Sequence, residues 1–127
     1  MREEVRVPGQ PEPISHYTDA VRAGDLLFVS GCVPVDADGR LVGGDDIVAQ
    51  ARQTFLNVGA VLAAGGSSPA DVVKVTVFLT DIDDRPKINP VRQDFFGDAR
   101  PASTLVEVSQ LAVPGAKIEV EAVALAR

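Results

Sequence analysis

Cys32 and His16 are the only cysteine and the only histidine in the chain, and their types first suggest nucleophilic chemistry. A cysteine nucleophile needs a neighbouring base and a third group that orients this base. The sequence offers no spacing that joins the two residues and no third group. We therefore expect Cys32 to be a small buried apolar residue and His16 to lie on the surface. A single cysteine also excludes a cysteine-cluster metal site and an intrachain disulfide.

Two other positions combine residue types that can serve chemistry. Glu119 and Glu121 lie in an alternating segment, so they share one face of a predicted strand. A carboxylate can orient a water molecule or take its proton, but a solvated strand face explains the pair equally well. Gly31 follows Ser30 at the end of an apolar run, where it would let the backbone approach a ligand closely, and a β-bulge is the alternative.

Composition and charge narrow the classes of protein and partner. The chain has 127 residues, 46% hydrophobic and 24% charged, which predicts one globular domain over residues 1–127. Its net charge is −6 and its basic residues are scattered, so nucleic acid and anionic membranes are poor partners. No apolar run is long enough to span a bilayer, and the first residues contain no apolar signal segment. With one cysteine, these features predict a cytoplasmic location.

The elements that must position these residues follow from hydrophobic periodicity. Residues 26–30 form an apolar run that predicts a buried strand. Asp45 or Asp46 can cap a helix that ends at the glycine pair 65–66. Gln50 is expected outside its apolar stripe. That stripe consists of Ile47, Ala51, Phe55, Val58 and Leu62.

The second half of the chain repeats the change from strand to helix. Residues 73–80 alternate between apolar and polar and predict a strand. Asn89 before Pro90 is typical of a helix start, so we expect a helix over 90–96, with an earlier start at Pro86 and a kink at Pro90 as the alternative. We expect the final strands over 104–108 and 117–125. This order predicts an α+β two-layer sandwich, with two helices on one face of a mixed sheet.

The other face of this sheet is predicted to lack cover. Phe78, Val123 and Leu125 point to it and make it too apolar to face water. A chain of 127 residues has no third layer to supply. Self-association through this face is the physical solution.

Five segments, in order, resemble one known family. The segments YTDAV, AGD and VSG over residues 17–31 are similar to its opening "PYSQAV…AG…VSGQ". AQARQ over 49–53, with Asn57, resembles "AAQTRQ…N", and DVVKVTVFLTD over 71–81 is close to "DVVKTTVFLTD". PAST over 101–104 and IEVEA over 118–122 resemble "PARS" and "IEIEA". This is the RidA (YjgF) family of reactive-intermediate deaminases, also described as endoribonuclease L-PSP-like.

The resemblance carries expectations about fold, assembly and activity. It implies a chorismate-mutase-like α+β fold and a homotrimer with small-molecule clefts between subunits. In active branches of the family, water hydrolyses 2-imino or 2-enamino acids to 2-keto acids and ammonium. The resemblance implies that no metal or cofactor takes part.

The family's pocket residues can be carried over position by position. Glu119 matches its catalytic glutamate, which positions or activates water. The matching substrate-binding positions are Tyr17, Ser30, Gly31, Asn89, Ser103 and Thr104. Two of them have structural alternatives: Tyr17 can be a half-buried packing aromatic, and Asn89 can be the cap of the predicted helix.

One position departs from the pattern. The family's "PARS" arginine grips the substrate carboxylate with two charge-assisted hydrogen bonds. Ser103 stands in its place. The loss of such a clamp costs roughly 1.5–3 kcal/mol or more, so the standard 2-aminoacrylate is expected to be a poor substrate. Arg100 is the one replacement that the sequence suggests, and a solvated loop charge explains it better.

Two functions therefore stay open from the sequence. The first is an imine or enamine hydrolase, a deaminase acting on C=N bonds, whose substrate does not need the arginine clamp. The second is a non-catalytic trimer that binds a metabolite or a protein partner in the same clefts. The acidic balance argues against the ribonuclease description attached to the family.

Overall fold

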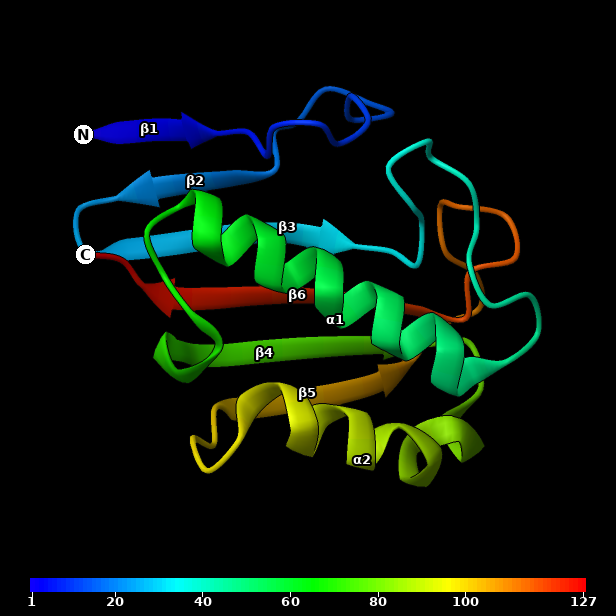
Figure 1. Cartoon of the computed structure of the whole chain (residues 1–127). Coiled ribbons are helices and arrows are strands. Elements are labelled where there is room, and N and C mark those ends of the chain that lie inside the picture. The colour runs from blue at the N-terminus through cyan, green and yellow to red at the C-terminus, as the bar shows by residue number, and fades with distance from the viewer.

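The computed structural model describes all residues from Met1 to Arg127 as one sheet with two helices on one of its faces (Figure 1). The strands are β1 (Arg2–Val5), β2 (Ala20–Ala23), β3 (Leu26–Cys32), β4 (Val72–Leu79), β5 (Ala102–Glu107) and β6 (Ile118–Leu125). The α-helices are α1 (Ile47–Ala64) and α2 (Arg85–Phe96), and short 3-10 helices occupy Pro69–Asp71 and Ile82–Asp84. Neither α-helix is long and apolar enough to cross a membrane.

The sheet is mixed, as the order of elements predicts. Its six strands run in the order β1-β2-β3-β6-β4-β5. All neighbours are antiparallel except β4 and β5, which are parallel because α2 carries the chain back between them. The predicted α+β sandwich, with both helices on one face of a mixed sheet, is confirmed.

The long helix α1 forms where the apolar stripe predicts it. The Asp46 carboxylate accepts hydrogen bonds from the backbone N–H groups of Val48 and Ala49, and Gly65 caps the other end. The whole stripe from Ile47 to Leu62 is buried against the sheet. Gln50 is buried as well, contrary to the prediction, because its amide binds three backbone groups of neighbouring loops. These groups are the carbonyls of Gly44 and Gly115 and the N–H of Lys117.

The helix α2 starts earlier than predicted. It begins at Arg85 and contains Pro90, so the prediction of a start at Pro90 is wrong. Pro86 occupies the first turn, where a missing N–H costs no helical hydrogen bond. Pro90 removes only the bond to the Pro86 carbonyl, and the buried contacts of Ile88, Val91 and Phe96 hold the helix in place.

The face of the sheet opposite the helices is apolar and uncovered. Phe28 pairs with Val123, and Leu26 pairs with Leu125, across β3 and β6. Phe28 is 45% exposed and Leu125 is 41% exposed. The predicted apolar open face is therefore present in the isolated chain.

Candidate functional site

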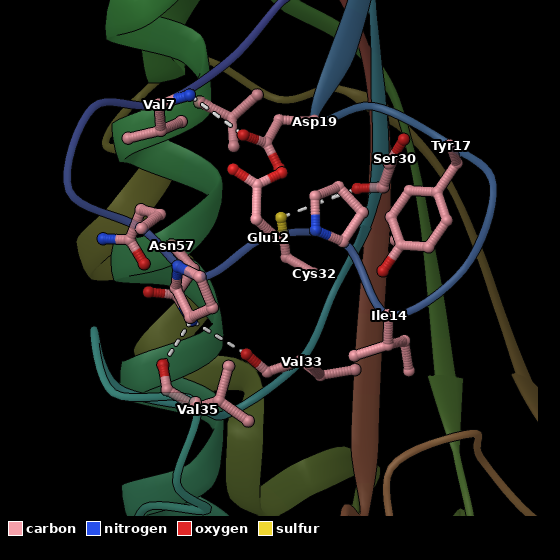
Figure 2. Close-up of a pocket in the computed structure, with 16 residues that line it drawn as sticks. Val7, Glu12, Ile14, Tyr17, Asp19, Ser30, Cys32, Val33, Val35 and Asn57 are labelled. Carbon is pink, nitrogen blue, oxygen red and sulfur yellow. Dashed lines mark hydrogen bonds between the residues drawn. The ribbon is translucent and has the colours of Figure 1, made fainter.

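The structure brings Tyr17, Ser30, Gly31 and Glu119 together around one hollow of about 310 Å³, which we call the Glu119 hollow. β3 supplies Ser30 and Gly31, and β6 supplies Glu119 from the open face of the sheet. Tyr17 comes from the loop before β2, and Figure 2 shows its ring beside Ser30. Four of the predicted site residues thus share one wall although they are up to 102 positions apart.

Gly31 lies directly beneath the Glu119 carboxylate. A Cβ at position 31 would overlap Oε2 of Glu119. The register between β3 and β6 also shifts between Val29 and Cys32, as it does at a β-bulge. Gly31 therefore combines a bulge with a close approach to another group. The bulge and the missing side chain leave room for the carboxylate at the rim of the hollow.

The surroundings of Glu119 favour the protonated form of its carboxyl. Burial raises the pKa of its carboxyl, and the neighbouring charge of Glu121 raises it further. A raised pKa makes the carboxylate a stronger proton acceptor than an exposed glutamate. The arrangement can therefore take a proton from a water molecule held in the hollow.

Tyr17 and Ser30 present their polar groups differently. The Tyr17 side chain is 48% exposed, and no protein group satisfies its hydroxyl. The Ser30 hydroxyl donates to the Thr18 carbonyl at 2.6 Å, so its oxygen remains available as an acceptor.

The remaining predicted residues lie away from the Glu119 hollow. Asn89 lines a second hollow of about 550 Å³ between the end of α2 and the start of β5, which we call the Arg92 hollow. Asn89 lies inside α2, so it does not cap the helix. Ser103 pairs with Val75 and points to the helix face of the sheet, whereas Thr104 points to the open face and accepts a hydrogen bond from Lys74 Nζ at 2.6 Å. A single chain therefore does not gather all the predicted residues.

Sequence reasoning missed Arg92. Its Nη2 donates to Ser103 Oγ at 2.8 Å. A guanidinium therefore does contact the serine that stands in place of the family's arginine. Arg100, the replacement that the sequence suggests, is exposed and lines the same hollow. The signal that could have found Arg92 is its spacing from Asn89, because residues three apart share a helix face.

A third cavity of about 150 Å³ lies behind the Glu119 hollow, between the N-terminal segment, the end of β3 and α1 (Figure 2). Two of its polar side chains have structural partners. Asn57 Nδ2 donates to the carbonyls of Val33 and Val35, and Asp19 accepts hydrogen bonds from Arg6 and from the Val7 N–H. This cavity supports the wall of the site.

Cys32 borders this third cavity as an inert thiol. Burial raises the pKa of its thiol to about 12, and the charges of Asp19 and Glu119 act in the same direction. A thiolate therefore does not form near neutral pH. His16 is exposed, and no three His, Cys, Asp or Glu side chains cluster as metal ligands.

The chain is similar to known proteins over nearly its whole length. The family model "Endoribonuclease L-PSP" matches residues 8–126. A RutC family protein of Pyrococcus horikoshii is 43% identical over 125 residues, which cover 98% of each chain. The 2-iminobutanoate/2-iminopropanoate deaminase of Salmonella typhimurium is 36% identical over the full length of both chains. The crystal structure of Escherichia coli TdcF with bound serine superposes with a TM-score of 0.89 at 33% identity, covering 98% of this chain and 99% of that one.

The match extends over nearly the whole chain and the whole of these relatives. It confirms the chorismate-mutase-like fold that the resemblance implies. The chain belongs to the Endoribonuclease L-PSP family, and this confirms its resemblance to the RidA (YjgF) family.

Proposed function

We propose that the protein hydrolyses an imine or enamine metabolite, with Glu119 as the general base. The observation that carries the proposal is the Glu119 carboxylate, which lies over Gly31 with a raised pKa and faces a hollow lined by Tyr17 and Ser30. The name of the Salmonella relative, an iminobutanoate deaminase, supports the same reaction type. We also propose a cytoplasmic location, where amino-acid metabolism produces such imines.

The reaction needs only water and proton transfers. Water adds to the imine carbon, and Glu119 accepts the proton that the water loses. Glu119 passes this proton to the imine nitrogen, which gives a neutral carbinolamine. The carboxylate then takes the proton of the carbinolamine hydroxyl and returns it to the nitrogen, as ammonia leaves and the carbonyl forms. One imine and one water thus give one carbonyl compound and one ammonia. No electrons leave or enter, so the reaction requires no redox cofactor.

We further propose that the working site lies between subunits of a homotrimer. The apolar open face, with Phe28 and Leu125 exposed, favours self-association. The Glu119 hollow and the Arg92 hollow share no lining residue within one chain. A seam between subunits can place the Asn89–Ser103 side of one chain against the Glu119 side of the next and so complete the set of pocket residues.

The serine at position 103 sets an expectation about substrates. A relative with arginine at that position can direct a complete guanidinium fork to a carboxylate next to the imine carbon. Ser103 cannot do so, so we expect 2-aminoacrylate to be hydrolysed more slowly here than by a relative that has this arginine. The loss of one charge-assisted hydrogen bond corresponds to a rate about 10- to 100-fold lower at low substrate concentration.

The neutral Ser103 also supports a second candidate, a non-catalytic trimer that binds a metabolite or a protein. One assay separates the two functions. An amino-acid oxidase generates a 2-imino acid, semicarbazide traps it, and hydrolysis by this protein lowers the yield of adduct. We expect the wild-type protein to suppress the adduct and Glu119→Gln to lose this effect. Equal adduct with and without the wild-type protein, across imines with and without a carboxylate, would favour the binding function.

A further inference from the structure

We propose that Arg92 binds the anionic group of the substrate, so that the cation missing from β5 is supplied by α2. The inference rests on the proposed function and narrows its substrate class to imines or enamines that carry a carboxylate. Arg92 is a specificity-determining residue in this account, and Glu119 remains the catalytic one.

The first support is the contact between Arg92 and Ser103. Ser103 projects from the edge strand β5 toward the helix layer, because its partner Val75 points into the core. Arg92 reaches it from α2, and the 2.8 Å hydrogen bond from Nη2 to Ser103 Oγ fixes the guanidinium beside the serine. A small side chain at position 103 leaves the space that this contact uses. The two positions therefore act as one unit, with a hydroxyl on the strand and a cation on the helix.

The second support is that Arg92 is half-buried and has no counterion. None of the ion pairs in the structure includes it, whereas Arg6, another half-buried arginine, lies 2.7 Å from the Asp19 carboxylate. Burial lowers the pKa of the Arg92 guanidinium, although an arginine stays charged under physiological conditions. A partly desolvated cation without a counterion is stabilised by an anion that enters its hollow.

The third support is the composition of the Arg92 hollow. Asn89 lies one helical turn before Arg92 and offers an amide donor to the same space. Arg100 adds a second positive charge at the rim, and Asp98 is the one acidic residue that lines the hollow. Asp98 is exposed and forms no ion pair with either arginine. The charge balance of the hollow therefore favours an anion.

This arrangement agrees with the expectation that the smallest imino acids are hydrolysed slowly. One Arg92 nitrogen already donates to Ser103, so the guanidinium is held in one orientation on α2. The Arg92 guanidinium on α2 lies at a different place from an arginine on β5. The carboxylate of the substrate must therefore reach the guanidinium on α2. With serine at position 103, the cation of the site is thus supplied by α2 instead of β5.

Steady-state kinetics on a matched pair of imines test the assignment. 2-Iminobutanoate, formed from 2-aminobutyrate by an amino-acid oxidase, carries a carboxylate. The aldimine formed from propylamine by an amine oxidase has the same carbon chain without it. We expect Arg92→Gln to raise KM for 2-iminobutanoate by about 10- to 100-fold with little change in kcat, and to leave KM for the aldimine unchanged. Arg85→Gln, an exposed arginine of the same helix, is the matched control and should change neither value.

Further variants separate Arg92 from its neighbours. Adding Ser103→Arg to Arg92→Gln should lower KM for 2-iminobutanoate most of the way back to the wild-type value, because it returns a guanidinium to the strand. Arg100→Gln should have less effect than Arg92→Gln. The inference is overturned if Arg92→Gln binds 2-iminobutanoate as well as Arg85→Gln does, or if Arg100→Gln carries the whole effect. Light scattering on each variant establishes that the assembly is unchanged.

A binding measurement keeps this inference separate from the proposed function. If the wild-type protein hydrolyses neither imine, hydrolysis as the function is wrong, but calorimetry with 2-ketobutyrate still tests the anion site. Binding by the wild-type protein that Arg92→Gln weakens by about tenfold or more supports the inference without catalysis. Equal binding by both, or binding by neither, contradicts it.

Discussion

At the scale of single residues, the pKa of Glu119 predicts the pH dependence of the reaction. The base works only when deprotonated, so activity falls as the pH drops through its pKa. Because burial and Glu121 raise this pKa, the acidic limb of the rate profile should lie above the pKa of an ordinary glutamate. Glu121→Gln removes one of the two causes and should move the limb to lower pH. A pH profile of kcat/KM for both proteins measures the shift, and an unmoved limb would contradict the assignment.

The same carboxylate should reduce stability at neutral pH. A group whose pKa is raised on folding binds protons more tightly in the folded state, so its contribution to stability falls as the pH rises through that pKa. Glu119→Gln removes the cost of a partly desolvated charge and should raise Tm at pH 7 while activity is lost. At a pH below the unperturbed pKa of glutamate, both forms are neutral and the difference should shrink. Calorimetry at the two pH values checks the sign, and a lower Tm for the variant at pH 7 would count against it.

Gly31 offers a steric test of the same site. Alanine at this position would place its Cβ against the Glu119 carboxylate, which must then move. The backbone of Gly31 does not adopt a positive φ angle, so alanine should not strain the strand itself. We expect Gly31→Ala to keep its fold by circular dichroism and to lose at least about tenfold in kcat. Full activity in this variant would mean that the position of the carboxylate does not matter.

At the scale of elements, Gln50 fixes the loops around α1. Its amide binds the Gly44 and Gly115 carbonyls and the Lys117 N–H from a fully buried position. Gln50→Leu would leave these groups without partners, at a cost of about 2–4 kcal/mol in the free energy of unfolding. Urea denaturation measures this cost. Arg52→Leu, at an exposed position of the same helix, should stay within about 0.5 kcal/mol, and similar values for the two variants would refute the role of Gln50.

The helices and strands also show which features of the fold the sequence can predict. The stripe of α1 and most of the alternation in β4 predicted buried faces correctly, because one periodicity dominates each segment. Val73, which the same alternation places on the buried face, is exposed, because the register between β4 and β6 shifts next to it. The start of α2 was predicted wrongly, since tertiary contacts of Ile88 keep Pro90 inside the helix. The contact between Arg92 and Ser103 was not predicted, because it depends on how α2 lies over the edge strand. The resemblance placed Gly31 and Glu119 in one pocket, but the close approach of the two residues was not predicted.

At the scale of the whole molecule, the open sheet face should hold the assembly together. Phe28 lies on this face and is 45% exposed in one chain. Phe28→Glu would place a charge in the proposed interface and should shift the protein toward monomers, with activity lost in parallel. Light scattering and the imine assay on the same samples test this link. A wild-type monomer, or a fully active monomeric variant, would contradict the trimer.

The most direct test of the central claim mixes two inactive variants. If each site takes Glu119 from one subunit and Ser103 from the next, Glu119→Gln and Ser103→Glu chains restore an intact site wherever they meet in the right order. Random co-assembly in equal amounts should place about a quarter of all sites in the wild-type arrangement. Rates at low 2-iminobutanoate concentration should then reach about a quarter of the wild-type value, well above either variant alone. A mixture no more active than the average of its two components would show that each site lies within one chain.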